Sequence, residues 1–242
     1  MELYYIRHAQ SENNALWADT GSAQGRSEDP DLTAVGRRQA MALARYLEQH
    51  RRPEPGPEPG HDPQNAQGFA FTHLYCSLMV RAVETGVSLA EALDLPLVAW
   101  PDVHEVGGIH ELDGKDEERV GLPGKNRAFF EQHYPQLILP ESLGEEGWWN
   151  RPFEYPAERP GRARRVLNEL QARHGDTDDR VAMVSHGGFY NHLLRILLDL
   201  PEDGGIWFSL NNTAITRIDF ENGATWIEYT NRVVFEDPGL IT

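Results

Sequence analysis

Two apolar, β-favouring runs in the chain each end in a histidine. Residues 3–6 are apolar and lead directly into Arg7 and His8, and the buried run at residues 180–185 leads into His186. Each run is followed by residues that suit a helix start. In an open α/β sheet, neighbouring strands place such turns on one rim, where ligands bind. The pattern therefore predicts that His8 and His186 converge at the sheet edge, and a cation beside an imidazole there suits an anion.

The remaining periodicity predicts alternating helices and strands. Apolar residues at helical spacing indicate helices over 33–51 (with Thr33 as N-cap), 79–93, 156–173 and 189–200. Period-two or continuous apolar runs indicate strands at 69–76, 95–100, 214–220 and 224–229, and the last two form a hairpin across Asn222-Gly223. Residues 15–31 are interpreted as a loop. The alternation predicts an α/β fold with a doubly wound, mainly parallel sheet flanked by helices.

The chain is interpreted as one domain, residues 1–242, with two interruptions. Residues 109–155 are polar and aromatic without regular periodicity, apart from a helical piece near 126–133, and are predicted to form an inserted cap. Residues 52–68 are rich in proline and glycine and predict a mobile surface loop, because the sheet pattern resumes after them. A partner-binding polyproline segment is the alternative for that stretch.

Composition and charge narrow the functional classes. The formal net charge is −16, with 22 basic against 38 acidic residues, so nucleic acid and anionic membranes are disfavoured as partners. A phosphorylated metabolite would also be repelled unless arginines reverse the potential locally. Cys76 is the single cysteine, which fits a reducing, cytoplasmic location, and no apolar run approaches a membrane span. The short apolar run at the N-terminus lacks a basic region before it, so it does not resemble a signal peptide.

The residues around the two histidines suit phosphoryl transfer. His8 can attack phosphorus through a neutral ring nitrogen, while Arg7 and Arg81 hold the equatorial oxygens. A protonated His186 adds a donor and positive charge, and Glu105 can give a proton to the leaving oxygen and later take one from water.

Five motifs then identify a resemblance. They are Arg7-His8-Ala9 with Ser11 and Asn14; Leu32-Thr33-Ala34-Val35-Gly36-Arg37-Arg38-Gln39-Ala40; Ser77, Arg81, Ala82 and Thr85; Ser185-His186-Gly187-Gly188; and Asn212-Thr213. Their identity and order resemble the histidine phosphatase superfamily, the phosphoglycerate-mutase-like group. The resemblance implies a phosphohistidine on His8, a phosphate pocket that includes Asn14, no metal and no cofactor, and a small phosphorylated metabolite as substrate.

The sequence departs from that family at two places. Ala9 stands where the family usually has glycine, which would add strain if the position needs a positive φ or a close backbone approach. Val106-Gly107-Gly108 follows Glu105 where the mutase branch usually has Arg-His-Tyr-Gly. The second departure favours a phosphatase over a mutase, because a mutase must exclude water and rebind its intermediate.

Several assignments keep an alternative. The proton donor could instead be Asp102, Glu111 or Asp113, and Asn14 and Ser11 could serve only as helix caps. Arg81 is also spaced to pair with Glu84 on its own helix. Trp148 and Trp149 are interpreted as cap core, and Lys115, Arg119, Lys125, Arg127 and Arg151 as a solvated surface from which one or two side chains reach the substrate. A phosphoglycerate-type mutase and a non-catalytic phospho-ligand module remain alternative functions, and a homodimer remains open.

Overall fold

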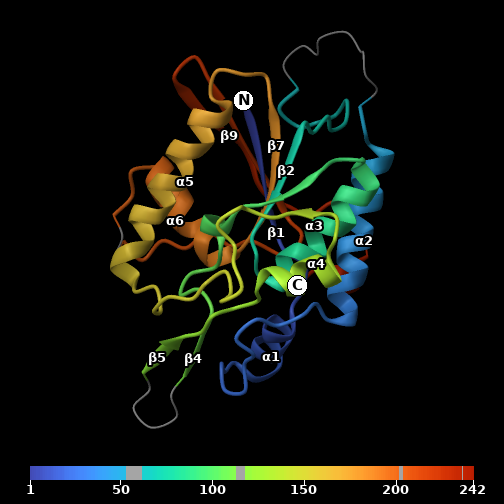
Figure 1. Ribbon diagram of the computed structural model, residues 1–242. Helices are drawn as coiled ribbons and strands as arrows, with labels where there is room; N and C mark the ends of the chain where they lie inside the picture. The colour runs from blue at the N-terminus through green and yellow to red at the C-terminus, as the bar shows by residue number, and fades with distance from the viewer. Residues whose placement is uncertain (53–61, 113–117, 202–203, 236) are drawn as a thin grey trace.

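The computed structural model describes residues 1–52, 62–112, 118–201, 204–235 and 237–242. A seven-stranded sheet runs through these ranges in the order β6-β3-β2-β7-β1-β8-β9 (Figure 1). The strands are β1 (Glu2–Arg7), β2 (His73–Cys76), β3 (Leu97–Ala99), β6 (Leu137–Ile138), β7 (Arg180–Ser185), β8 (Ile215–Glu221) and β9 (Ala224–Arg232). The first five positions of that order pair in parallel, and β8 and β9 are antiparallel. The predicted α/β class with a mainly parallel sheet is confirmed.

Two helical layers cover the two faces of the sheet. Side chains of β1 alternate between these faces and therefore contribute to both buried clusters. Tyr4 and Ile6 pack in a buried cluster with α2 (Ala34–Gln49) and α3 (Val80–Leu93). Leu3 and Tyr5 pack in a second cluster with α5 (Arg159–His174) and α6 (Gly187–Leu197). Figure 1 shows these two helix pairs on opposite sides of the strands.

The predicted loop at 15–31 is wrong in its first part, because α1 spans Glu12–Thr20. Ser11 caps the helix by accepting from Asn14 N, and Gly21 ends it in the left-handed region at φ 64°. No residue of α1 is buried. The helix is therefore defined by its caps and carries no apolar stripe that periodicity could detect.

Other boundaries moved by a few residues. Residues 69–72 precede β2 instead of belonging to it, and a 3₁₀ turn at Pro156–Glu158 precedes α5. The helix after His186 begins at Gly187, earlier than apolar spacing indicated, and ends at Leu197. The hairpin of β8 and β9 is as predicted, with Asn222 at φ 52° and Gly223 at φ 75°.

Residues 109–155 are more ordered than the sequence indicated. They contain a two-stranded hairpin of β4 (His110–Leu112) and β5 (Arg119–Gly121), followed by α4 (Arg127–His133), which Asn126 caps. The segment then returns to the central sheet, because β6 pairs in parallel with β3. The β4–β5 hairpin and α1 project at the same end of the molecule (Figure 1). The region is thus partly an extension of the sheet.

The predicted mobile loop lies mostly outside the described residues, which omit 53–61. Its later part is attached to the sheet, because Asn65 Nδ2 donates to the Tyr4 hydroxyl at 2.8 Å.

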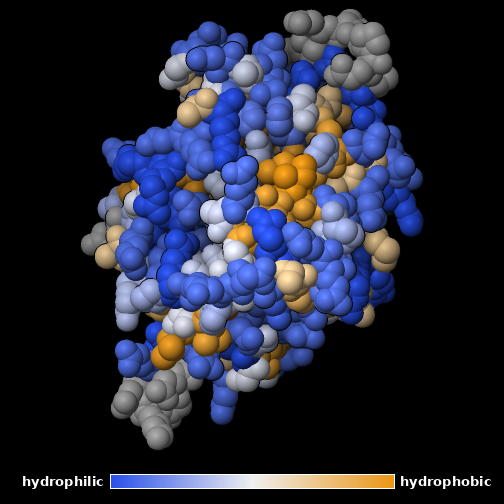
Figure 2. Space-filling view, viewed as in Figure 1, coloured by the Kyte–Doolittle hydropathy of each residue, from blue (hydrophilic) through white to orange (hydrophobic). Residues whose placement is uncertain are grey.

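Figure 2 shows a face covered mainly by hydrophilic residues, with an apolar patch between α5 and the α2–α3 pair. Within the described residues, no helix has the length and apolarity needed to cross a membrane.

Candidate active site

The two histidines meet at the carboxyl end of adjacent strands. The parallel pairing of β1 with β7 aligns Arg7 with Ser185, so His8 and His186 leave the sheet side by side. Their ring centroids are 5.0 Å apart, and both residues are buried. The predicted convergence of the two imidazoles is confirmed. Two side chains nearly two hundred positions apart in the chain therefore lie next to each other at one edge of the sheet.

His8 is held in one tautomer by its neighbours. Its Nδ1 lies 2.7 Å from the Ala9 carbonyl oxygen, which can only accept, so Nδ1 carries the proton. Its Nε2 accepts a hydrogen bond from Arg81 Nε at 3.3 Å. Burial, together with the charges of Arg81 and Arg7, lowers the pKa of His8 well below its ordinary value. A neutral imidazole with its lone pair on Nε2 is the form that a nucleophile requires.

His186 has two buried ring nitrogens without a hydrogen-bond partner among the described residues. Burial, with the Arg81 charge, lowers the pKa of His186 well below its ordinary value and so disfavours the protonated ring. The lowered pKa opposes the protonated His186 that the sequence analysis invokes as an extra positive charge. Its backbone is fixed by Tyr5, whose hydroxyl donates to the His186 carbonyl at 2.7 Å and accepts from its N–H at 3.1 Å. An anion between the rings would supply the acceptor that the imidazole lacks.

Arg81 extends from the first turn of α3 toward His8 and is buried. Its Nη1 lies 3.7 Å from Asp29 Oδ1, and that carboxylate also accepts from Val80 N at 3.1 Å. The alternative pairing with Glu84 is wrong, because Glu84 accepts from Leu32 N at 2.7 Å instead. Asp29 was missed because it lies in an irregular segment that carries no motif.

Arg7 lies beside the first turn of α6. Its Nη1 donates to the Leu210 carbonyl at 2.5 Å, and its buried Nε has no partner among the described residues. Burial lowers the pKa of Arg7, and the positive charge of Arg81 acts in the same direction. Guanidinium groups remain charged at neutral pH, so Arg7 and Arg81 make this edge of an acidic protein locally positive.

Asn14 and Ser11 form the cap of α1, as the alternative reading held. The Asn14 amide oxygen accepts from Ser11 N at 3.2 Å and from Asn212 Nδ2 at 3.2 Å. Asn212 Nδ2 also donates to the His8 carbonyl at 2.8 Å. Asn14 is therefore linked to the backbone of His8 through one amide. Its NH₂ group is the part left to face an anion, so a phosphate-binding role stays a prediction.

Glu105 is a half-buried carboxylate at the N-terminus of α6. Its oxygens accept from the backbone N–H groups of Gly188 at 3.1 Å, Phe189 at 2.9 Å and Val106 at 2.8 Å. A Cβ on Gly188 would lie 2.4 Å from Glu105 Oε1, so the glycine makes this close approach possible. Helix N-termini stabilise negative charge, and the three donors orient the carboxylate next to His186.

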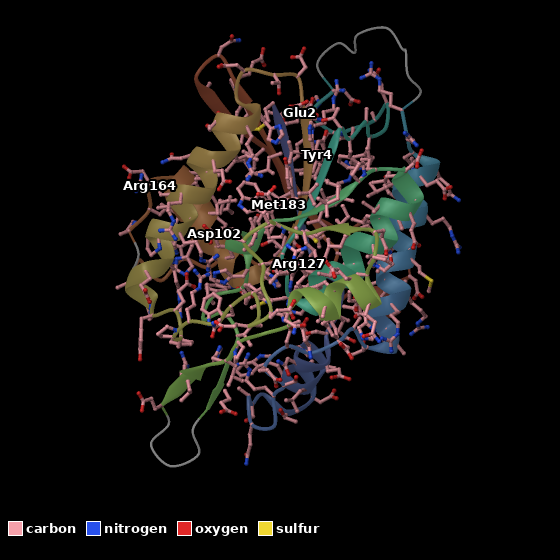
Figure 3. All side chains as sticks on the ribbon, in the orientation of Figure 1. Glu2, Tyr4, Asp102, Arg127, Arg164 and Met183 are labelled. Atoms are coloured by element: carbon pink, nitrogen blue, oxygen red, sulfur yellow. The ribbon has the colours of Figure 1, made fainter. Side chains whose placement is uncertain are left out.

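The competing carboxylates are placed differently. Asp102 faces α5, where its Oδ2 lies 4.0 Å from Arg165 Nε, and Figure 3 shows it on that side of the molecule. Glu111 is exposed on β4, and Asp113 lies outside the described residues. Among the described candidates, Glu105 is the one bound to the N-terminus of α6, which follows His186.

A buried ion pair positions the Glu105 loop. Arg162 Nε and Nη2 bind the Glu154 carboxylate at 2.5 and 2.8 Å. Arg162 Nη1 donates to the carbonyl oxygens of Asp102 at 2.8 Å and His104 at 2.9 Å. Glu154 in turn accepts from Gly107 N at 3.2 Å. Sequence reasoning missed this pair, since neither residue belongs to a motif and their contact is made by folding alone.

Comparison with known proteins places the chain in a family. The profile of the "Histidine phosphatase superfamily (branch 1)" matches residues 3–54 and 63–233. The chain belongs to the histidine phosphatase superfamily.

Individual relatives of this chain carry two kinds of name. "Probable phosphoglycerate mutase GpmB" of Yersinia enterocolitica is 27% identical, over 94% of this chain and 88% of its own. "Putative phosphoserine phosphatase 2" of Hydrogenobacter thermophilus is 24% identical, over 96% and 95%. The solved phosphoserine phosphatase of Entamoeba histolytica, in complex with 3-phosphoglyceric acid, has a TM-score of 0.59 at 20% identity, covering 99% of this chain and 98% of that one. The structural likeness confirms the fold.

The first departure from the usual histidine phosphatase motif, Ala9, causes no strain in this fold. Its φ is not positive, and the side chain is buried against Leu32 and Ala40. The close approach is made instead by Gly36, whose Cβ would lie 2.0 Å from the Gln10 carbonyl oxygen. The glycine usual at the position of Ala9 is therefore unnecessary for the backbone conformation seen here.

The second departure, Val106-Gly107-Gly108, lies in the loop that follows Glu105. Gly107 and Gly108 have positive φ values of 89° and 70°, and a Cβ on Gly108 would lie 2.1 Å from Trp149. Trp149 is buried against Met79 and Ile109, as expected for cap core. A glycine pair therefore lets the tryptophan occupy space beside the Glu105 loop.

The basic residues of the cap region divide by their contacts. Arg151 stacks on Trp149, Lys125 on Phe129 and Arg119 on Phe153, while Arg127 donates to backbone carbonyls. Lys115 lies outside the described residues. Arg26, which the sequence did not indicate, contacts His110 Nε2 at 2.5 Å. Burial lowers the pKa of Arg26, and the charge of Arg81 lowers it further. The solvated surface expected for the cap is thus partly a set of cation–aromatic contacts.

Proposed function

We propose that this protein is a phosphomonoester hydrolase that transfers the phosphoryl group of a small phosphorylated metabolite to His8 and then to water. The tautomer of His8 is the observation that carries the proposal. The Nδ1 contact with Ala9 leaves the Nε2 lone pair directed at the space shared with Arg81 and His186. Membership of the histidine phosphatase superfamily supports this reading.

Binding would use the cationic edge of the site. Arg7 and Arg81 hold the equatorial oxygens of the phosphoryl group, and the Arg7 Nε without a partner is available to do so. The unpartnered ring of His186 supplies a further N–H, and a bound dianion favours its protonation. The amide NH₂ of Asn14 completes the set.

The reaction then proceeds in two displacements. His8 Nε2 forms a bond to phosphorus while the phosphorus–oxygen bond of the ester breaks, and Glu105 gives its proton to the leaving alkoxide. Water next attacks the phosphohistidine, Glu105 takes a proton from that water, and phosphate leaves with His8 restored. Protein side chains suffice for every step, so neither a metal nor a cofactor is invoked.

Replacing His8 with alanine tests the assignment. We expect His8→Ala to abolish turnover of a generic phosphate ester. Wild-type protein that is mixed with an ester labelled in its phosphoryl group and then rapidly quenched should carry acid-labile, base-stable labelled phosphate. His133→Ala, which removes an exposed histidine from α4, serves as the matched control and should keep full activity. Persistence of turnover in purified His8→Ala protein would refute a nucleophilic role for His8.

A phosphoglycerate-type mutase is the second candidate, favoured by the similarity to the Yersinia protein named as a probable mutase. Both reactions use the same pocket, but a mutase needs a bisphosphate primer and exclusion of water. Conversion of 3-phosphoglycerate should be measured with and without 2,3-bisphosphoglycerate. Fast interconversion with little free phosphate would replace the phosphatase proposal, whereas release of phosphate without a primer supports it.

A cytoplasmic location is supported by the single cysteine, which the fold buries at the end of β2. A homodimer stays a prediction.

A further inference from the structure

Three side chains of types that can bind metals gather at the opposite end of the strands from His8 and His186. His73 begins β2, His174 ends α5, and Asp179 immediately precedes β7. The Asp179 carbonyl accepts from Glu2 N at 2.8 Å, and Figure 3 places Glu2 at the amino end of β1, away from the β4–β5 hairpin. The three residues therefore form a cluster independent of the proposed phosphatase chemistry.

We propose that His73, His174 and Asp179 bind a divalent transition-metal ion, with Zn²⁺ as the occupant that best fits the donors. His174 Nδ1 lies 2.8 Å from one carboxylate oxygen of Asp179, and His73 Nδ1 lies 3.6 Å from the other. One ligand atom from each residue lies within 4.8 Å of the others. Ligand atoms of one tetrahedral zinc ion are about 3.3 Å apart, and each of the two contacts, made to a different oxygen of the carboxylate, is close to that spacing.

The remaining adjustment can come from His73. Its side chain is 41% exposed, whereas that of His174 is 4% exposed and fixed in the protein. Metal binding would require the His73 ring to rotate, so that its Nδ1 exchanges its contact with the Thr72 hydroxyl, at 2.9 Å, for the ion. The carboxylate is 23% exposed, so an ion can enter from solvent and keep a water molecule as a further ligand.

The surroundings of His174 suit metal binding. Its Nε2 lies 3.1 Å from the Tyr75 hydroxyl, which can either donate or accept. Without metal, the tyrosine can donate to Nε2 while Nδ1–H donates to Asp179. With metal, Nε2–H can donate to the tyrosine while the Nδ1 lone pair binds the ion. A hydrogen-bonded second nitrogen of this kind orients metal-ligating histidines in proteins.

The turn between the ligands is also fixed. Thr177 donates its hydroxyl to the His174 carbonyl at 2.8 Å and accepts from Asp179 N at 3.1 Å. Two imidazoles with one carboxylate favour zinc, nickel or copper over magnesium or calcium, which prefer oxygen donors alone. Binding would tie the end of α5 to the starts of β2 and β7. The ion would therefore stabilise the fold without taking part in turnover.

The test is a titration of metal-free protein with Zn²⁺ by calorimetry, with Co²⁺ absorption as a readout of ligand geometry. We expect one ion per chain, the visible bands of four-coordinate cobalt, and a higher melting temperature with zinc. His73→Ala should weaken binding by at least about tenfold and abolish the melting shift, as should Asp179→Asn, which preserves the shape of the side chain. His133→Ala is the matched control and should bind as wild type does.

Two outcomes would overturn the proposal. One is the absence of zinc binding at millimolar concentration by folded protein. The other is binding that both ligand variants leave unchanged, which would locate the ion elsewhere, for example at His8 and His186. Phosphatase activity of His73→Ala protein is measured in parallel and should equal that of wild type. The activity of His8→Ala protein tests the proposed function only. Its outcome does not bear on the metal site, which the zinc titration tests.

Discussion

At the scale of single residues, the site depends on how buried charges are balanced. Asp29 neutralises part of the Arg81 charge and lies almost wholly inside the protein. Burial raises the pKa of its carboxyl from 3.8 to about 6, although the Arg81 charge and the hydrogen bond from Val80 oppose that shift. The folded protein therefore binds the Asp29 proton more readily than the unfolded chain does.

The sign of this shift gives a pH prediction. Between pH 3.8 and about 6 the native state holds more protons at Asp29 than the unfolded state, so stability contributed by this group falls as pH rises and levels off above the folded pKa. A shift of this size corresponds to about 3 kcal/mol. Urea unfolding should be measured for wild type and Asp29→Asn across this range. The free energy of unfolding of wild type, relative to that of Asp29→Asn, should fall with rising pH. A difference independent of pH would contradict the assignment.

Glu105 gives a prediction about leaving groups. Glu105→Gln keeps the shape of the side chain but cannot transfer a proton, so hydrolysis of alkyl phosphates should slow by about 10²–10⁴ and that of aryl phosphates by less. The comparison is made by measuring kcat across esters whose leaving groups differ in basicity. An equal loss for all esters would show that Glu105 acts through helix capping alone.

Gly188 offers an independent test of the same contact. A methyl group at Gly188 would meet Glu105 Oε1 at 2.4 Å, so Gly188→Ala should displace the carboxylate and reduce kcat by about 10²-fold, the scale of a misplaced catalytic group. Gly161→Ala on α5 is the matched control, because its Cβ would meet only the end of Arg165 at 3.8 Å. Activity should be lost in the first variant and retained in the second, with both folded by circular dichroism.

At the scale of elements, α5 holds the loop that carries the proposed proton donor. Arg162 on this helix binds Glu154 and two carbonyl oxygens of the 102–104 turn, and its guanidinium stacks on Phe189 of α6. One buried side chain thus connects two helices and the Glu105 loop. Since a buried charge without its partner is costly, this contact couples stability to site geometry.

Truncation of Arg162 should therefore be severe. We expect Arg162→Ala to lower the free energy of unfolding by about 3–5 kcal/mol, because the Glu154 charge remains buried alone. Arg164→Ala is the control, since Arg164 is exposed on the same helix and Figure 3 shows it on the outer side of α5. Urea denaturation measures both, and similar small losses in the two variants would contradict a structural role for the ion pair.

At the scale of the whole molecule, charge works against the substrate. The net charge is −16, and the face in Figure 2 is largely hydrophilic, so an anionic ester meets long-range repulsion. Local positive charge at the site comes from the guanidinium groups of Arg7, Arg81 and Arg26. Self-repulsion of the acidic surface also opposes the compact state, and salt screens it.

Added salt should therefore stabilise the fold. Raising sodium chloride from low to about 0.5 M, where the Debye length falls below about 8 Å, should raise the melting temperature by several degrees. Differential scanning calorimetry measures this shift, and an equal osmolality of sucrose provides the uncharged comparison. A melting temperature that does not change with salt would show that the surface charges are already balanced locally.

The sequence by itself determined the strand-to-helix turns at His8 and His186, the helix cap at Thr33, the Asn222-Gly223 hairpin and the motif set that identifies the superfamily. These features depend on local periodicity, capping and turn chemistry, which neighbouring residues encode. The extent of α1 beyond its predicted start and the β6 strand were not predicted, because α1 has no buried face and β6 is two residues long.

Tertiary structure alone decided the partners of the buried groups. Asp29 beside Arg81, Glu154 beside Arg162, Glu105 on the N-terminus of α6, and His73 with His174 and Asp179 are contacts between segments that the chain keeps far apart or leaves without a motif. The partner of a buried charged side chain is the group that the fold places within contact distance after water has been excluded. That choice depends on packing of the whole sheet and its two helical layers, which no local pattern records.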